Sequence, residues 1–99
     1  MATEFDLSDK QDIKIEPPKM RKVILHNDDY TPDTFVVDVL RQVFHQNEEK
    51  AFSIMSDAHK TGKAIAGVFP AEIAESKVSA VQQIASDEGH PLEASTEIE

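Results

Sequence analysis

The feature that most constrains the fold is a short apolar strand that leads through a polar loop directly into a helix. Residues 23–32 are VILHNDDYTP. This order places Asp28 and Asp29 at the rim of a hydrophobic layer, where burying an unpaired carboxylate is expensive. Thr31 is a good N-cap and Pro32 suits the first helical position. The polar residues are therefore explained either by a tight turn or by a cation-binding site.

Composition limits what such a chain can do. Its 99 residues suffice for one small domain with a single core, and the formal net charge is −9. This charge argues against nucleic acid and anionic membranes as partners, because Lys and Arg must neutralise phosphates. The chain has no Cys and no apolar run near the roughly 20 residues that span a bilayer. It also lacks a signal peptide, so we expect a cytoplasmic protein.

The pattern of apolar residues predicts a tail and six structural elements. Residues 1–19 are charged and end near two prolines, which predicts a disordered tail before a core domain of residues 20–99. The predicted elements are strands at 20–26, 63–69 and 92–98, and helices at 32–45, between Asn47 and Gly62, and from Pro70 to before Gly89. The order β-α-α-β-α-β predicts an α+β fold of two layers. Three helices then cover one face of a three-stranded, largely antiparallel sheet.

Each predicted helix has one apolar face at helical spacing. These faces comprise Phe35, Val36, Val39, Leu40, Val43 and Phe44 in the first helix, Ala51, Phe52, Met55, Ala58 and His59 in the second, and Ile73, Ala74, Val78, Val81, Ile84 and Ala85 in the third. We expect these faces to form the core with the apolar residues of the strands.

No set of residues predicts an enzyme or a resident metal or cofactor. The chain lacks a Cys nucleophile, a Gly-x-Ser-x-Gly turn and a glycine-rich phosphate loop. Its histidines, at positions 26, 45, 59 and 90, match no common metal-ligand spacing. A cation held by Asn27, Asp28 and Asp29 would need further oxygen ligands to resemble a calcium loop. We therefore expect a protein that binds other molecules without catalysis.

His59 is the second position of interest. It lies near the apolar face of the predicted second helix, and the simplest interpretation is a half-buried histidine bonded to a backbone carbonyl. The alternative is that the loop of Asn27, Asp28 and Asp29 lies beside this helix. Acceptor groups would then converge at the mouth of an apolar pocket. Such a site suits a primary ammonium attached to a hydrophobic side chain, as at the free N-terminus of a polypeptide.

Several segments of the chain resemble the ClpS family, adaptors that bring N-degron substrates to a Clp protease. The similar segments are residues 22–25, 27–32, 35–40, His59 with 62–64, and residues 67–69, 71–78 and 90–92. They cover roughly residues 20–92 in order, and the NDDYTP block with the downstream histidine is a specific signal. The resemblance implies a fold similar to the C-terminal domain of the ribosomal stalk protein.

The resemblance also implies roles for individual residues. Asn27, Asp29 and His59, with Asp28 beside them, would hold the α-ammonium of a substrate that begins with Phe, Leu, Trp or Tyr. The pocket for the first side chain would comprise Leu25, Thr31, Val36, Met55, Ala58 and Leu92. Glu72 and Lys77, expected to be exposed on the third helix, would dock onto the N-terminal domain of ClpA, the unfoldase of the ClpAP protease.

Two positions depart from the family pattern. Asp33 occupies a position at which family members often have a Met that gates the pocket against β-branched side chains. Its carboxylate either removes this gate or points into solvent at the start of the helix. Ala58 replaces a common Val, which predicts a wider pocket. An alternative function for the whole chain is a stalk-like interaction module that binds a partner protein without recognising N-terminal residues.

Overall fold

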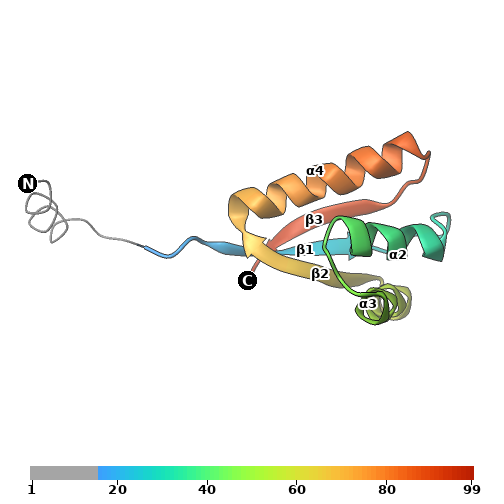
Figure 1. Cartoon of the computed structure of the whole chain (residues 1–99), viewed down its shortest axis with the longest axis horizontal. Coiled ribbons are helices and arrows are strands. Elements are labelled where there is room, and N and C mark those ends of the chain that lie inside the picture. Colours follow the sequence, from blue (N-terminus) through green and yellow to red (C-terminus); the bar gives the residue numbers. More distant parts are fainter. Residues whose placement is uncertain (1–15) are drawn as a thin grey trace, which may run out of the picture.

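The computed structural model describes residues 16–99, which form a small sheet with helices against it (Figure 1). The elements are β1 (Met20–His26), α2 (Asp33–Gln42), α3 (Glu48–Thr61), β2 (Lys63–Pro70), α4 (Ala71–Asp87) and β3 (Glu93–Ile98). This is the predicted α+β order. Residues 1–15 of the predicted tail lie outside the described residues, and residues 16–19 are exposed and have no regular structure.

The sheet is built around β1. Its strand order is β2-β1-β3, and both neighbours are antiparallel to β1. Val23, Ile24 and Leu25 of this central strand are almost completely buried, and Val23 and Leu25 belong to the core cluster. The β1–β2 register shifts after Val23, which leaves Ala66 as the extra residue of a β-bulge. The Nε2 amide of Gln46 donates to the carbonyl of Ala66 at 2.9 Å.

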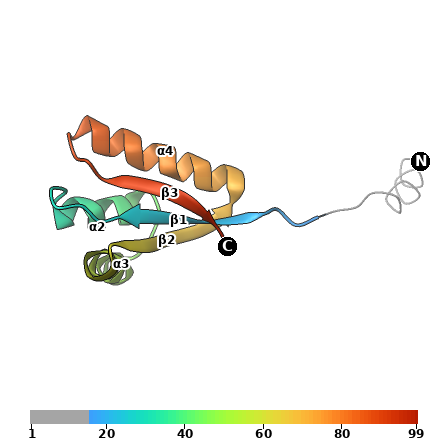
Figure 2. The same cartoon turned by 180° about the vertical axis from the view of Figure 1, so that it is seen from behind.

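The helices enclose the core against this sheet. Helix α4 packs on all three strands, whereas α3 contacts β2 and α2. Both views show α3 beside β2, at one edge of the sheet, and α4 along β3 (Figures 1 and 2). The largest fully buried side chains are Leu25, Leu40, Val23 and Val81, which come from β1, α2 and α4. At the end of the sheet where β1 begins, the N–H of Ala71 donates to the carbonyl of Lys19 at 2.9 Å.

The predicted boundary signals of α3 are confirmed. The side chain of Asn47 accepts a hydrogen bond from the backbone N–H of Lys50 at 2.7 Å, and Gly62 ends the helix in the left-handed conformation. Helix α2 ends at Gln42, three residues before the predicted end. The cause is local, since His45 has a positive φ of 56°, which no α-helix can contain.

Three expectations about burial are wrong. Phe52 of α3 and Ile73 of α4 are 59% and 46% exposed, although both were expected to face the core. Ile54 takes an inward position on α3 instead and is buried on the same face as Ala51, Met55 and Ala58. His59 is also exposed. None of the helices within residues 16–99 combines the length and the apolar composition that a membrane span requires.

Gly67 lies beneath the ring of Phe69, and the first prediction concerns this contact. A Cβ at residue 67 would lie 2.7 Å from the nearest carbon of the Phe69 ring. The centre of that ring lies 6.1 Å from the centre of the Phe44 ring. We expect Gly67→Ala to lower the free energy of unfolding by about 1–3 kcal/mol, as for other overpacked sites. Urea denaturation measures this change.

A double-mutant cycle provides the control for this prediction. In a Phe69→Leu background the ring is absent, so Gly67→Ala should cost less than half as much. An equal cost in both backgrounds would show that the ring of Phe69 is not the reason for glycine at this position.

Candidate functional site

The loop after β1 is held by the carboxylate of Asp28. Its Oδ1 accepts the backbone N–H groups of Tyr30 at 2.8 Å and Thr31 at 2.7 Å, and its Oδ2 accepts the Thr31 hydroxyl at 2.8 Å. Thr31 therefore turns back toward the loop and does not cap α2. The N-cap residue is Pro32, which makes no side-chain bond, so the predicted N-cap role of Thr31 is wrong. The hydroxyl is instead turned toward Asp28, to which it donates a charge-assisted hydrogen bond.

This loop lies beside the end of α3, as expected. The backbone N–H of Asn27 donates to the carbonyl of Gly62 at 2.9 Å. His59 lies one turn before Gly62, in the last turn of α3. The left-handed Gly62 thus joins two segments that are more than thirty residues apart in the chain and places Asn27 and His59 at the same end of the sheet.

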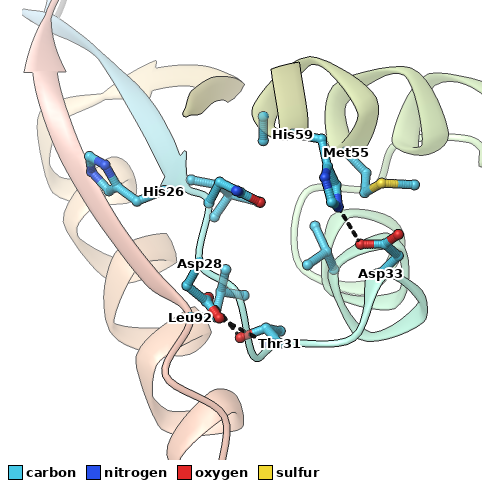
Figure 3. Close-up of a pocket in the computed structure, with 11 residues that line it drawn as sticks. His26, Asp28, Thr31, Asp33, Met55, His59 and Leu92 are labelled. Carbon is cyan, nitrogen blue, oxygen red and sulfur yellow. Dashed lines mark hydrogen bonds and ion pairs between the residues drawn. The ribbon is translucent and has the colours of Figure 1, made fainter. Parts of the chain in front are cut away.

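A pocket opens between the loop, α2, α3 and the start of β3 (Figure 3). It is lined by Leu25, His26, Asn27, Asp28, Thr31, Asp33, Val36, Met55, Ala58, His59 and Leu92. The structure therefore brings together all the residues predicted for the substrate site except Asp29, which is exposed and does not line the pocket. His26 lines the pocket although it was not predicted. Its position immediately before the Asn-Asp-Asp loop is the sequence signal that could have indicated it.

The floor of the pocket belongs to the hydrophobic core. Leu25, Met55, Ala58 and Leu92 are each at most 7% exposed. Val36 of α2 is partly buried and packs against the same core. An apolar floor with polar groups at the mouth is the usual design of a small-ligand site, in which a few polar groups fix the orientation of the ligand.

Asp33 and His59 form a pair at the mouth of this pocket. Nε2 of His59 lies 2.8 Å from Oδ1 of Asp33 and donates to it when that nitrogen carries the ring proton (Figure 3). The two side chains are 53% and 55% exposed. The interpretation of His59 as a half-buried residue bonded to a backbone carbonyl is therefore wrong. Asp33 is exposed at the start of α2 but does not simply point into solvent, because it contacts α3.

The cavity is narrow in this state. Its volume is about 10 Å³, close to what one water molecule requires. A large side chain can enter only if groups around the mouth move. The Asp33–His59 pair is the group that costs least to displace, because an exposed polar pair contributes no more than about 0–1 kcal/mol, whereas the floor residues are held by the core.

The electrostatics of the loop keep Asp28 charged. Partial burial raises the pKa of Asp28, but the hydrogen bonds from the backbone and hydroxyl of Thr31 and from the N–H of Tyr30 lower it more, and nearby His90 adds to this effect. The pKa of Asp28 therefore lies below its ordinary value. The mouth of the pocket thus carries carboxylates and other acceptors, which suits a cationic group attached to an apolar one.

A metal site was the other interpretation considered for the acidic loop. Within residues 16–99, no three His, Asp or Glu side chains are placed so that they could hold a metal ion together. The carboxylate of Asp28 accepts hydrogen bonds from Thr31 and Tyr30, so this residue has the turn-forming role that the sequence offered as one of two interpretations.

The two residues expected at a second interface differ in their surroundings. Glu72 is exposed in the first turn of α4. Lys77 is only partly exposed, which corrects the expectation that both are free on the surface. Its ammonium donates to the carbonyl of Val43 at 2.7 Å and lies 5.4 Å from the centre of the Phe69 ring. Lys77 therefore also connects α4 to the end of α2.

Comparison with known proteins gives consistent matches over this region. The family model of the ATP-dependent Clp protease adaptor protein ClpS matches residues 16–95. An ATP-dependent Clp protease adapter protein ClpS from Clostridium acetobutylicum is 49% identical over 92 residues, which are 93% of this chain and 91% of the relative. The solved structure of Agrobacterium tumefaciens ClpS2 bound to L-phenylalaninamide superposes with a TM-score of 0.81 and 41% identity, and covers 84% of this chain and 100% of that one.

The Asp28 turn generates the second prediction. Because the pKa of Asp28 is lower in the folded protein than in the unfolded chain, its charge stabilises the fold above the unfolded value of about 3.9. This contribution is lost as the pH falls through the folded-state pKa. We expect Asp28→Ala to lower the free energy of unfolding by about 1–2 kcal/mol at pH 7, and by less below about pH 4.

Urea denaturation between pH 7 and pH 2 measures this difference. Asp29→Ala is the matched control, because Asp29 is an exposed neighbour and its loss should change stability by less than about 0.5 kcal/mol. A difference between wild type and Asp28→Ala that stays constant with pH would contradict the role of the charge.

Proposed function

The chain belongs to the ClpS family of ATP-dependent Clp protease adaptor proteins, and we propose that its pocket binds the free N-terminal residue of N-degron substrates. It is an adaptor for Clp-dependent protein degradation, and adaptors of this family are not catalysts. We also propose that it acts in the cytoplasm, where its substrates would be presented to the protease.

This proposal rests mainly on one observation: the pocket combines an apolar floor with hydrogen-bond acceptors at its mouth. A free N-terminal residue combines an α-ammonium with a side chain on the adjacent carbon, so both parts of the pocket are used at once. The similar structure of Agrobacterium tumefaciens ClpS2 contains L-phenylalaninamide, which has this combination of groups. We propose that the present pocket accepts the same chemistry, with Phe, Leu, Trp and Tyr as first residues.

The proposed roles follow the position of each side chain. Leu25, Val36, Met55, Ala58 and Leu92 would contact the first side chain, which contributes about 1.5–3 kcal/mol when it is buried. Hydrogen bonds to the ammonium add about 1.5–3 kcal/mol each. Because association itself costs several kcal/mol, affinities near micromolar are expected.

We propose that the ammonium contacts Asn27 and His59 at the mouth. Thr31 forms part of the wall, and Asp28 contributes its negative charge while it holds the loop. Asp29 does not line the pocket, so it would act through water or through its charge alone. Asp33 would release His59 as the substrate enters, since their exposed pair is weak.

The third prediction tests N-terminal recognition with fluorescence anisotropy. Labelled peptides that begin with Phe, Leu, Tyr or Trp should bind with near-micromolar dissociation constants. N-acetylation of the Phe peptide should weaken binding by about 100-fold, since it removes the charge and a donor and leaves acceptors unpaired. Binding should also weaken above about pH 8, because an α-amino group titrates near pH 7.7–8.0.

The same series tests the gate. Because Asp33 bonds to His59 and presents no apolar surface, peptides that begin with Ile or Val should bind within about tenfold of the Phe peptide, and Asp33→Met should weaken them selectively. No binding by any free N-terminus would contradict the proposed function. Equal binding of the acetylated peptide would show that the ammonium is not recognised.

We further propose that Glu72 and Lys77 contribute to docking on the N-terminal domain of the ClpA unfoldase. The proposal is supported by position, because the start of α4 and the end of β1, where the pocket opens, lie at opposite ends of the domain (Figure 1). A substrate in the pocket and an unfoldase at α4 would therefore not compete for the same surface.

The fourth prediction separates docking from substrate binding. Glu72→Ala should weaken binding to ClpA about fivefold, equivalent to about 1 kcal/mol, and leave the affinity for a Phe peptide unchanged. Glu75→Ala is the matched control, because Glu75 is exposed on the same helix. Surface plasmon resonance with immobilised ClpA measures both variants. Equal effects of the two substitutions would contradict a specific role for Glu72.

A further inference from the structure

A second cavity, which the roles above do not use, lies between α2 and α3. Its volume is about 360 Å³, and its walls include Val37 and Arg41 of α2 and Phe52 of α3. We call it the α2–α3 groove. It shares Asp33 and Met55 with the pocket, so the two cavities meet at these side chains. Figure 3 shows Asp33 and Met55 together on one side of the pocket, next to His59.

The groove exposes apolar surface that has no partner within the described part of the chain. Phe52 is 59% exposed, although large aromatic side chains usually contribute most of their area to a core or an interface. Val37 is only partly buried beside it. An exposed aromatic side chain in a groove that adjoins the proposed binding pocket indicates an interaction surface.

The groove is also acidic. Its lining includes Asp33, Asp38 and Glu48, against the single positive charge of Arg41. All four side chains belong to exposed residues. Complementary charge favours a partner segment with basic residues and disfavours one with acidic residues.

The direction of the groove matches the path of a bound polypeptide. His59, Met55 and Phe52 lie at intervals of four and three residues and therefore share one face of α3. The rise of a helix places Phe52 about 10 Å from His59 along α3. An extended chain covers this distance in about three residues. A substrate whose first residue fills the pocket can therefore place its third or fourth residue on Phe52.

We propose that the α2–α3 groove binds residues 2–4 of the N-degron substrate and prefers an apolar side chain flanked by basic residues. This inference rests on the proposed function, because the first residue must be anchored in the pocket. The occupant is the continuation of the substrate chain, since the groove adjoins the pocket at Asp33 and Met55, which line both.

Calorimetric titration of the full chain tests this proposal with three peptides and L-phenylalaninamide. The peptides begin Phe-Lys-Leu-Lys, Phe-Ser-Gly-Ser and Phe-Glu-Ser-Glu and are otherwise identical. The Lys-Leu-Lys peptide should bind about tenfold more tightly than the Ser-Gly-Ser peptide, equivalent to about 1.4 kcal/mol. The Glu-Ser-Glu peptide should bind most weakly, and this difference should decrease with added salt.

Phe52→Ser should reduce the preference for Lys-Leu-Lys to less than about threefold and leave the affinity for L-phenylalaninamide unchanged. Ile73→Ser is the matched control, because Ile73 is 46% exposed on α4 and lies outside both cavities. This control should retain the full preference. Circular dichroism of both variants establishes that they are folded.

The outcomes distinguish the two proposals. If L-phenylalaninamide binds and the three peptides bind equally, the groove proposal is wrong and the proposed function stands. If neither L-phenylalaninamide nor any peptide binds, the proposed function itself fails. If the peptides bind equally and sedimentation shows a dimer that Phe52→Ser abolishes, the groove binds a second copy of the chain and the proposal is overturned.

Discussion

The structure depends on the burial of β1 between two antiparallel neighbours. Val23, Ile24 and Leu25 are at most 3% exposed, so this strand cannot shift by one residue without turning its side chains to the wrong faces of the sheet. Its end is therefore placed accurately, and the polar loop that follows must begin at the rim of the core. The hydrogen bonds of Asp28 then set the path of the loop into α2.

The pocket combines parts of different stability. Its floor consists of side chains that also form the core, so its shape there is maintained by the free energy of folding. Its mouth is formed by exposed polar side chains whose mutual interactions are weak. For the binding proposed above, a cavity of about 10 Å³ would therefore open by rearrangement of its mouth, while its floor stays in place.

Sequence reasoning predicted the elements well because their signals are local. The apolar run of β1, the Asn47 cap and the left-handed Gly62 each depend on a few neighbouring residues. It failed for two polar side chains that bond to other partners in the fold. Thr31 was expected to cap α2 but donates to Asp28, and His59 was expected to bond to a backbone carbonyl but pairs with Asp33. Helix rotation was a second source of error, because Phe52 lies at the edge of an apolar stripe, where a small rotation decides between core and solvent.

The bond between Lys19 and Ala71 has a mechanical consequence. It ties the chain that enters β1 to the first residue of α4, next to the pairing of Met20 with Pro70. A pulling force on the segment before β1 would first load these bonds at the end of the sheet remote from the pocket (Figure 2). Tension there is resisted by both neighbours of the central strand before it reaches the pocket. The pocket and the point of load are thus mechanically separate within one small domain.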